Sequence, residues 1–444
     1  MNLEKIQKEG TKMMMQFAIP CVIAMVLSSA ITLVDGYFIG NYVGKEGTAA
    51  VNLGLPLLYF YLGVGIMIGV GGIAQAGIAL GGGLTEKCNQ IFRESIGLTT
   101  LVTVGTTVIV ALLFFPVTSL FSIDKVTLEY FQQYYFIIIF ELPIMILNNN
   151  LGMFMRGEGK PQISMFISIL SLVLNCIFDY LAVRVFGFGI AGIAVSSLIS
   201  VVICLVISLL FFAKGAKIYH LGKFKFQKED VKQILFNGSS ELIGEMSMCI
   251  TMAAYNAVIL KVSGVAGVAA FAVVGYASYF VEMIIIGIGQ GMTPLVSFAY
   301  GAKDVSTARK LCKAATIVST VVGAITFVVM VLGRNEYGQF FIKNHEIQQM
   351  ISTGILIFSG SFILVGFNTM ASFYYTAIGR AKESAVISMA RGLVILLIAL
   401  CILPQFLGIN GVWLVAPVTE IITVAICLVC YSKNHEFVKS CYNK

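Results

Sequence analysis

The sequence predicts an all-α integral membrane protein with twelve transmembrane helices, arranged as two parallel repeats of six. Three observations lead to this prediction. Of the 444 residues, 58% are hydrophobic and only 11% are charged, whereas about 25% are charged in an ordinary soluble domain. The apolar stretches are continuous, as in 161–183 and 311–332, whereas transmembrane β-strands alternate over about 10 residues. The second half of the sequence also repeats the pattern of the first.

Each apolar stretch is long enough to cross a bilayer core about 30 Å thick, which requires ~20 helical residues. Loops with charged residues, glycine or proline separate the stretches. The first stretch follows a charged start and is too long for a signal-peptide core, so we expect an uncleaved span. The expected helices lie near 13–38, 48–79, 92–115, 131–154, 161–185, 188–212, 233–259, 268–299, 311–333, 351–376, 383–406 and 409–431.

The basic residues predict the orientation of these spans. An even number of spans places both termini on one side of the membrane. If that side is the cytoplasm, 22 of the 29 Lys and Arg residues lie in cytoplasmic segments and six lie outside, as the positive-inside rule requires. The formal charge of +7 is then a signal of topology, and it does not favour nucleic acid as a partner.

The repeat appears when the sequence is compared with itself at an offset of 220 residues. It includes loops as well as spans: Gly44, Gly69 and Gly81 recur as Gly264, Gly289 and Gly301. Six spans per repeat give both halves the same orientation, as in transporters built from parallel repeats. We predict an N-lobe at 1–213, a cytoplasmic linker at 214–232 and a C-lobe at 233–444. Between the lobes we expect a cavity that opens alternately to either side.

Polar residues that only one repeat carries are the candidate functional residues. Asp35 lies in the first span, and Tyr255 is its counterpart in the second repeat. The fifth span carries a polar face that ends with Asn175 and Asp179, one helical turn apart. The residues of this face are Ser164, Ser168, Ser171, Asn175 and Asp179, and their counterparts are Ser384, Ser388, Arg391, Ile395 and Ala399.

A buried acid in a span costs several kcal/mol unless it faces a cavity, pairs or titrates. With Asn175 and the hydroxyl group of Ser197, Asp35 and Asp179 would form an all-oxygen site for a hard cation or a shared proton. The alternative is that these groups only fix helix packing. Pro20 removes a backbone hydrogen bond from the first span and should permit a kink, which could couple the charge of Asp35 to helix shape.

Acids in the second half suggest a different role. Glu245 in the seventh span and Glu282 in the eighth would attract cationic substrates if they face the central cavity, and interfacial or packing roles are the alternative. We place Tyr255 and Asn368 with them as candidates for the substrate cavity. The three histidines, His220, His345 and His435, lie in loops or tails without a partner motif, so we do not expect an enzyme.

Six segments spread over the chain carry a family resemblance. They are LVDGYFIGNYVGKEGTAAVNLGLP (33–56), RGEGKPQ (156–162), NCIFDY (175–180), GIAGIAVSS (189–197), GQGMTPLVSFAYGAKD (289–304) and GINGVWLVAPVTE (408–420). In order and spacing the chain resembles the multidrug and toxic compound extrusion (MATE) family, especially its bacterial multidrug exporters. The resemblance implies the MATE fold and a location in the cytoplasmic membrane of a bacterium.

The resemblance also implies site residues. The N-lobe cation site of the family falls on Asp35, Asn175 and Asp179, with Ser197 where many members have threonine, and Asn149 matches a polar position near it. Members with a C-lobe cation site have an aspartate in the tenth span, where this chain reads Gly366, Phe367, Asn368 and Thr369. We therefore do not expect a C-lobe cation site.

These observations favour an antiporter that exports organic, cationic and amphipathic drugs or toxins and works as a monomer in the lipid bilayer. The coupling ion would be H+ or Na+, with Asp35, Asn175 and Asp179 binding Na+ in the second case, and no other cofactor is expected. A flippase for a lipid-linked precursor, a major facilitator transporter and a membrane receptor are the alternatives. The loop at 80–93 lacks the Asp-Arg signature of major facilitator transporters, and a receptor would need neither the repeat nor the asymmetric acids.

Overall fold

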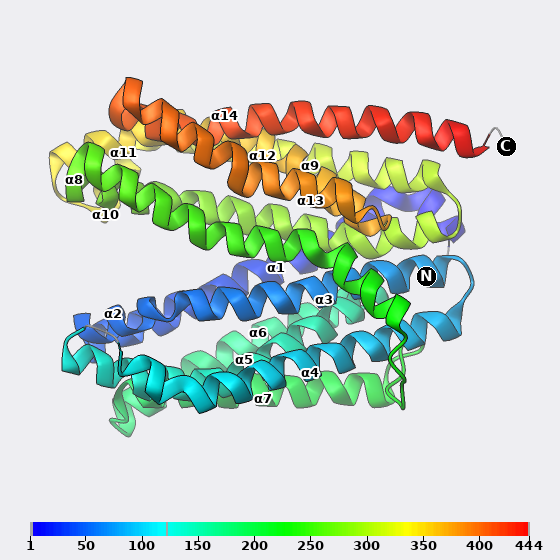
Figure 1. Cartoon of the computed structure of the whole chain (residues 1–444), viewed down its shortest axis with the longest axis horizontal. Helices are drawn as coiled ribbons and strands as arrows, with labels where there is room; N and C mark the ends of the chain where they lie inside the picture. The colour runs from blue at the N-terminus through cyan, green and yellow to red at the C-terminus, as the bar shows by residue number, and fades with distance from the viewer. Residues whose placement is uncertain (1–2, 121–122, 443–444) are drawn as a thin grey trace.

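A computed structural model describes residues 3–120 and 123–442, with side chains up to residue 433, and these residues form helices and no strands (Figure 1). The α-helices are α1 (Leu3–Tyr42), α2 (Lys45–Leu53), α3 (Leu55–Gly81), α4 (Thr85–Thr118), α5 (Lys125–Gly157), α6 (Pro161–Tyr180), α7 (Gly189–Lys214), α8 (Lys228–Gly301), α9 (Val305–Leu332), α10 (Arg334–Phe341), α11 (His345–Phe358), α12 (Phe362–Ala377), α13 (Ala381–Met389) and α14 (Ile395–Tyr442).

Ten helical segments of the described chain are long and apolar enough to cross a membrane. Two of them are interrupted in their interior by a glycine with positive φ, Gly264 (φ 63°) in α8 and Gly408 (φ 57°) in α14. Each of these glycines divides its segment into two spans, which gives the twelve spans that the sequence predicts. Their counterparts in the first repeat, Gly44 (φ 101°) and Gly189 (φ 60°), also have positive φ, a conformation that favours glycine. The sequence repeat is therefore also a backbone repeat.

Several boundaries differ from the predicted ones. The second span is interrupted at Gly54, between α2 and α3, and the tenth contains a 3-10 turn at Ser359–Ser361. The seventh span begins at Lys228 instead of 233, because Glu229 and Asp230 favour a helix N-terminus. Short π-helical turns occupy Leu181–Val185 and Ala390–Val394, in the fifth and eleventh spans. Such turns are rare and often occur at functional sites.

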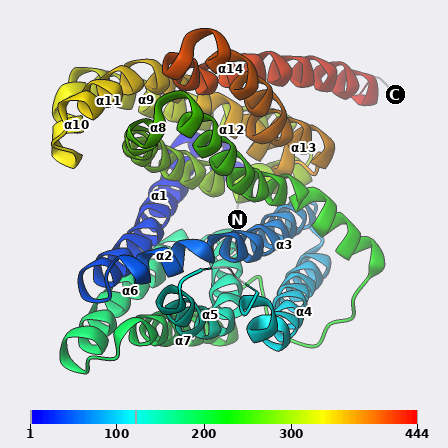
Figure 2. The same cartoon turned by 60° about the vertical axis from the view of Figure 1, so that its left-hand side comes forward.

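The helices form two groups. Figure 2 shows α2–α7 on one side, α8–α14 on the other and α1 between them, and α1 packs against both α6 and α8. The non-helical segment 215–227 joins the groups. We call its end of the bundle the linker end; α1 begins and α14 ends there (Figure 1). The buried apolar residues form one large cluster in the second group and the adjoining part of α1, and two smaller clusters mainly in the first group.

The two groups meet at the linker end through glycines. A Cβ atom added to Gly81 of α3 would lie 2.0 Å from the carbonyl oxygen of Phe298 in α8. A Cβ atom on Gly301 would lie 2.0 Å from the carbonyl oxygen of Ile78. The offset of 220 relates these two contacts to each other. Because the opposing atoms belong to the backbone, neither contact leaves room for a side chain.

We expect Gly81→Ala and Gly301→Ala each to cost ~1–3 kcal/mol of stability, the usual penalty for overpacking. The matched control is Gly105→Ala in α4, where a Cβ atom meets nothing within 4 Å and stability should stay the same or increase. Thermal unfolding of the purified proteins measures the difference. If Gly81→Ala is as stable as Gly105→Ala, the close approach of the two groups is not a rigid contact.

Candidate functional site

Three helices of the first group bring the predicted cation-site residues together. Asp35 comes from α1, Asn175 and Asp179 from α6, and Ser197 from α7. The side-chain amide of Asn175 donates a hydrogen bond of 3.1 Å to the Ser197 hydroxyl oxygen. Asp179, Asn175 and Ser197 all lie close to the Asp35 carboxylate. Asp179 is 0% exposed, and Asn175 and Ser197 are also buried.

Four oxygen atoms of this cluster are buried without a hydrogen-bond donor among the described residues. They are Oδ1 of Asp35, Oδ1 of Asn175, and Oδ1 and Oδ2 of Asp179. Two ionised carboxylates that lie close together repel each other unless a proton or cation lies between them. A set of oxygen acceptors suits a hard cation. The arrangement can therefore hold a proton or a hard cation. It contains only two acids, whereas metal sites typically contain three or more His, Cys, Asp or Glu side chains. No such group of three or more occurs in the described chain.

The surroundings of the cluster include residues that the sequence did not single out. Tyr134 of α5 is buried, and it lies near the carboxyl groups of Asp35, Asp179 and Glu141. Ser196 lies next to Asp179, but its hydroxyl donates to the carbonyl oxygen of Gly192 at 2.8 Å. Tyr134 has no spacing signal that links it to α1 or α6. Only the three-dimensional packing of α5 against these helices brings it near.

Two other predicted residues of the first half have no described hydrogen bond to this cluster. Asn149 of α5 is exposed and makes no hydrogen bond to the cluster in the described structure, whereas its neighbour Asn150 donates to Thr99 at 2.7 Å. Pro20 lies within α1, and the non-helical backbone conformation in that helix is at Glu9 (φ −120°, ψ 24°). A role for Asn149 and a kink at Pro20 stay predictions.

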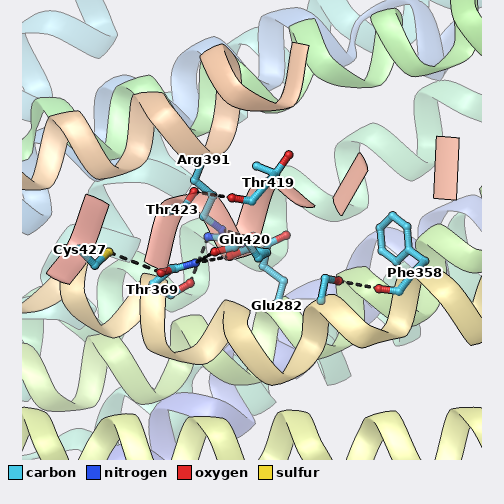
Figure 3. Close-up of polar contacts among 10 residues, drawn as sticks. Glu282, Phe358, Thr369, Arg391, Thr419, Glu420, Thr423 and Cys427 are labelled. Carbon is cyan, nitrogen blue, oxygen red and sulfur yellow. Dashed lines mark hydrogen bonds and ion pairs between the residues drawn. The ribbon is translucent and has the colours of Figure 1, made fainter. Parts of the chain in front are cut away.

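In the second half, four helical segments bring an ionic group together. Figure 3 shows Arg391, from the π-helical turn, beside Glu282 of α8, Glu420 of α14 and Thr369 of α12. The guanidinium donates to Oε1 of Glu420 at 2.6 Å, to the Thr369 hydroxyl at 3.0 Å and to Oε1 of Glu282 at 3.4 Å. The Asn368 amide donates to Oε2 of Glu420 at 2.7 Å. The sequence predicted Glu282 and Asn368 as site residues but gave no partner for Arg391.

The remaining candidates take different positions. Glu245 lies where the two groups of helices meet, because a Cβ atom on Gly63 of α3 would be 3.2 Å from the Cβ atom of Glu245. Tyr255 is buried and stacks on Phe271, with ring centroids 4.6 Å apart. Asn368 is fully buried. Substrate contacts by Tyr255 and Asn368 stay predictions, and in this structure both side chains face the protein interior.

Comparison with known proteins gives concordant matches over the whole chain. A family model described as MatE matches residues 20–181 and 243–403, once in each half. A multidrug export protein MepA of Staphylococcus saprophyticus is 24% identical over 430 residues, which cover 95% of this chain and 93% of the relative. MepA of Staphylococcus aureus strain MSSA476 is 24% identical over 426 residues, with the same two coverages.

Solved structures share the fold. A crystal structure described as MATE in complex with MaL6 has a TM-score of 0.92 and 21% identity and covers 97% of both chains. An outward-facing multidrug resistance MATE family transporter has a TM-score of 0.91 and 22% identity, with the same coverage of both chains.

Proposed function

We propose that this chain, which belongs to the multidrug and toxic compound extrusion (MATE) family, exports organic cations from the cell in exchange for H+ or Na+. The family assignment makes it a multidrug efflux transporter and replaces the flippase, major facilitator and receptor alternatives. The coupling ion, the cationic substrates and the alternating access belong to the proposal. So do monomeric function and the location in a bacterial cytoplasmic membrane with both termini in the cytoplasm.

The observation that carries the proposal is the group of unsatisfied oxygens around Asp35 and Asp179. Four buried acceptors without a donor are costly in a hydrocarbon environment, so they need a bound proton or cation. Because Asp35 and Asp179 come from different helices, the bound ion would favour the arrangement of α1 and α6 that holds both carboxylates close. A ligand shifts a conformational equilibrium only by its difference in affinity between the states, and these carboxylates supply such a difference.

The energy available is sufficient for useful export. Moving one charge through 100 mV supplies about 2.3 kcal/mol, which corresponds to roughly a fifty-fold concentration ratio for a neutral compound. Exchange of one H+ or Na+ for a monovalent cation is electrically neutral, and the ion gradient alone then drives it. A tenfold gradient supplies ~1.4 kcal/mol.

The test is ethidium efflux from proteoliposomes that contain the purified protein, with a pH gradient or a Na+ gradient imposed separately. We expect one of the two gradients to drive efflux well above the leak of protein-free liposomes. The gradient that succeeds identifies the coupling ion. If neither gradient drives the efflux of ethidium, the proposal of a cation-coupled exporter of organic cations is wrong.

A further inference from the structure

We infer that Arg391 competes with the substrate for Glu282: its guanidinium pairs with the Glu282 carboxylate until an organic cation displaces it. Arg391 thereby sets the affinity of the transporter for organic cations. It acts indirectly, through its pairing with Glu282, and is in this sense a positioning residue. The inference rests on the proposed export of organic cations. It assigns the recognition of positive charge to one carboxylate of the C-lobe, apart from the ion site around Asp35.

The contacts of Arg391 with its two acids are unequal. The contact with Glu420 is 2.6 Å long and uses Nε, whereas the contact with Glu282 is 3.4 Å long and uses Nη2 (Figure 3). The 2.6 Å contact is typical of a strong charge-assisted hydrogen bond, and the 3.4 Å contact is longer than such bonds normally are. Arg391 is therefore held firmly by Glu420 and loosely by Glu282.

Burial separates the two acids in the same way. The side chain of Glu420 is 7% exposed and that of Glu282 is 34% exposed. The Asn368 amide donates a hydrogen bond of 2.7 Å to the second carboxylate oxygen of Glu420, so both oxygens of this carboxylate have donors. Glu282 has its one long contact with Arg391. A ligand that enters this region can reach Glu282 and not Glu420.

The charge balance leaves one negative charge for a ligand. Two carboxylates and one guanidinium sum to −1, and Glu420 takes the larger share of the guanidinium. The remaining charge lies on Glu282. A monovalent cation that approaches Glu282 replaces the 3.4 Å contact, and Arg391 stays paired with Glu420. Neither charged group is then left buried without a partner, which is the costly outcome in ion-pair exchange.

Residues from both groups of helices lie around Glu245 and Glu282. Glu245, which packs against Gly63 of α3, lies within electrostatic range of Glu282. Tyr279 lies near both acids and near Ser29 in α1. Tyr59 of α3 is in range of Tyr279 and Glu245. Aromatic rings beside carboxylates suit an organic cation, because the ring faces attract positive charge.

The test measures ethidium binding by fluorescence polarisation, with the full chain purified in lipid nanodiscs. E282Q removes the charge that the substrate would bind and should weaken binding by about tenfold or more, the effect of ~1.4 kcal/mol. E420Q frees Arg391 to pair fully with Glu282, so it should weaken binding roughly three- to tenfold although Glu420 is buried away from the ligand. The double variant R391M/E420Q keeps the net charge at −1 and removes the competitor, so it should bind ethidium about tenfold more tightly.

The matched control is E383Q. It removes the acid of another Arg–Glu pair in the same lobe, Arg380–Glu383 at 2.9 Å, and should leave ethidium affinity unchanged. A purely structural role for Arg391 predicts no tightening in R391M/E420Q, so this variant separates the two roles. Thermal unfolding of each variant confirms that it is folded before binding is measured.

The outcomes separate the inference from the proposed function. If the wild-type protein binds ethidium and E282Q weakens binding, but R391M/E420Q binds no more tightly than wild type, the competitor role is wrong and cation export still stands. If R391M/E420Q aggregates, E420Q decides, and an unchanged affinity overturns the inference. A wild-type protein that binds no ethidium overturns both the inference and the proposed substrate class.

Discussion

Asp179→Asn is expected to reduce gradient-driven ethidium efflux by about tenfold or more, to the level of the leak. The substitution keeps the size of the side chain but replaces one carboxylate oxygen with an amide that can donate a hydrogen bond to Asp35. The cluster then keeps only the Asp35 carboxylate, which the new amide satisfies, so the paired-acid site that would bind and release an ion is lost. Asp35→Asn should act in the same way, since the two carboxylates form one site. Efflux from proteoliposomes under the gradient that drives the wild-type protein is the measurement.

The control is Asp124→Asn, the same chemical change in a loop. Asp124 accepts a hydrogen bond from the Thr127 amide at 2.9 Å and caps α5, and asparagine caps helices about as well. This variant should transport at the wild-type rate. Asp179→Asn protein should still bind ethidium, which distinguishes lost coupling from lost folding. Driven efflux at the wild-type rate in Asp179→Asn would exclude Asp179 from the coupling site.

Arg391→Met is expected to destabilise the protein by ~3–5 kcal/mol, because it leaves Glu420 buried without its cation. Adding Glu420→Gln to this variant should recover most of the loss, since the uncompensated charge is then absent and Asn368 can still bond to the new side chain. The measurement is the temperature of unfolding of the purified proteins. The departure of the two substitutions from additivity gives the free energy of the interaction between Arg391 and Glu420.

Lys45→Met is the control for the loss of a lysine or arginine charge. The Lys45 side chain is 91% exposed, and its pair with Glu46 is 3.7 Å long, so its removal should leave the unfolding temperature unchanged. If Arg391→Met unfolds at the same temperature as Lys45→Met, Glu420 does not depend on Arg391. The ionic group would then contribute little to the stability of the second group of helices.

Much of the fold could be predicted from the sequence, because apolar stretches and an offset of 220 report directly on spans and repeats. The interruptions could not be placed in the same way. The breaks at Gly54 and at 359–361 lie inside apolar stretches, so hydropathy does not change there. At Gly264 and Gly408 the boundaries between spans were predicted, but consecutive spans join there through a single glycine instead of a longer loop. A local change of φ at one glycine has no signature in composition.

The candidate ion site was partly predictable for a different reason. Asn175 and Asp179 lie one turn apart on α6, and comparison of the repeats selected Asp35, so a local spacing and an internal comparison were sufficient. The group around Arg391 required contacts among residues 282, 369, 391 and 420. No periodicity connects positions so far apart in the chain. Counting acids along the sequence therefore indicated Glu282 but not the arginine that holds it.

The glycine contacts at the linker end have a further consequence. Gly81 meets Phe298 as Gly301 meets Ile78, so at the linker end the two halves present matching contacts to each other. This is an isologous interface, the kind that joins the subunits of a two-fold homodimer, contained within one polypeptide. The halves differ in their polar interiors, where one has a pair of carboxylates and the other has an arginine between two acids. A symmetric contact thus joins two halves whose polar interiors differ. The polar residues that differ between the halves do not alter the glycine contacts by which the halves pair.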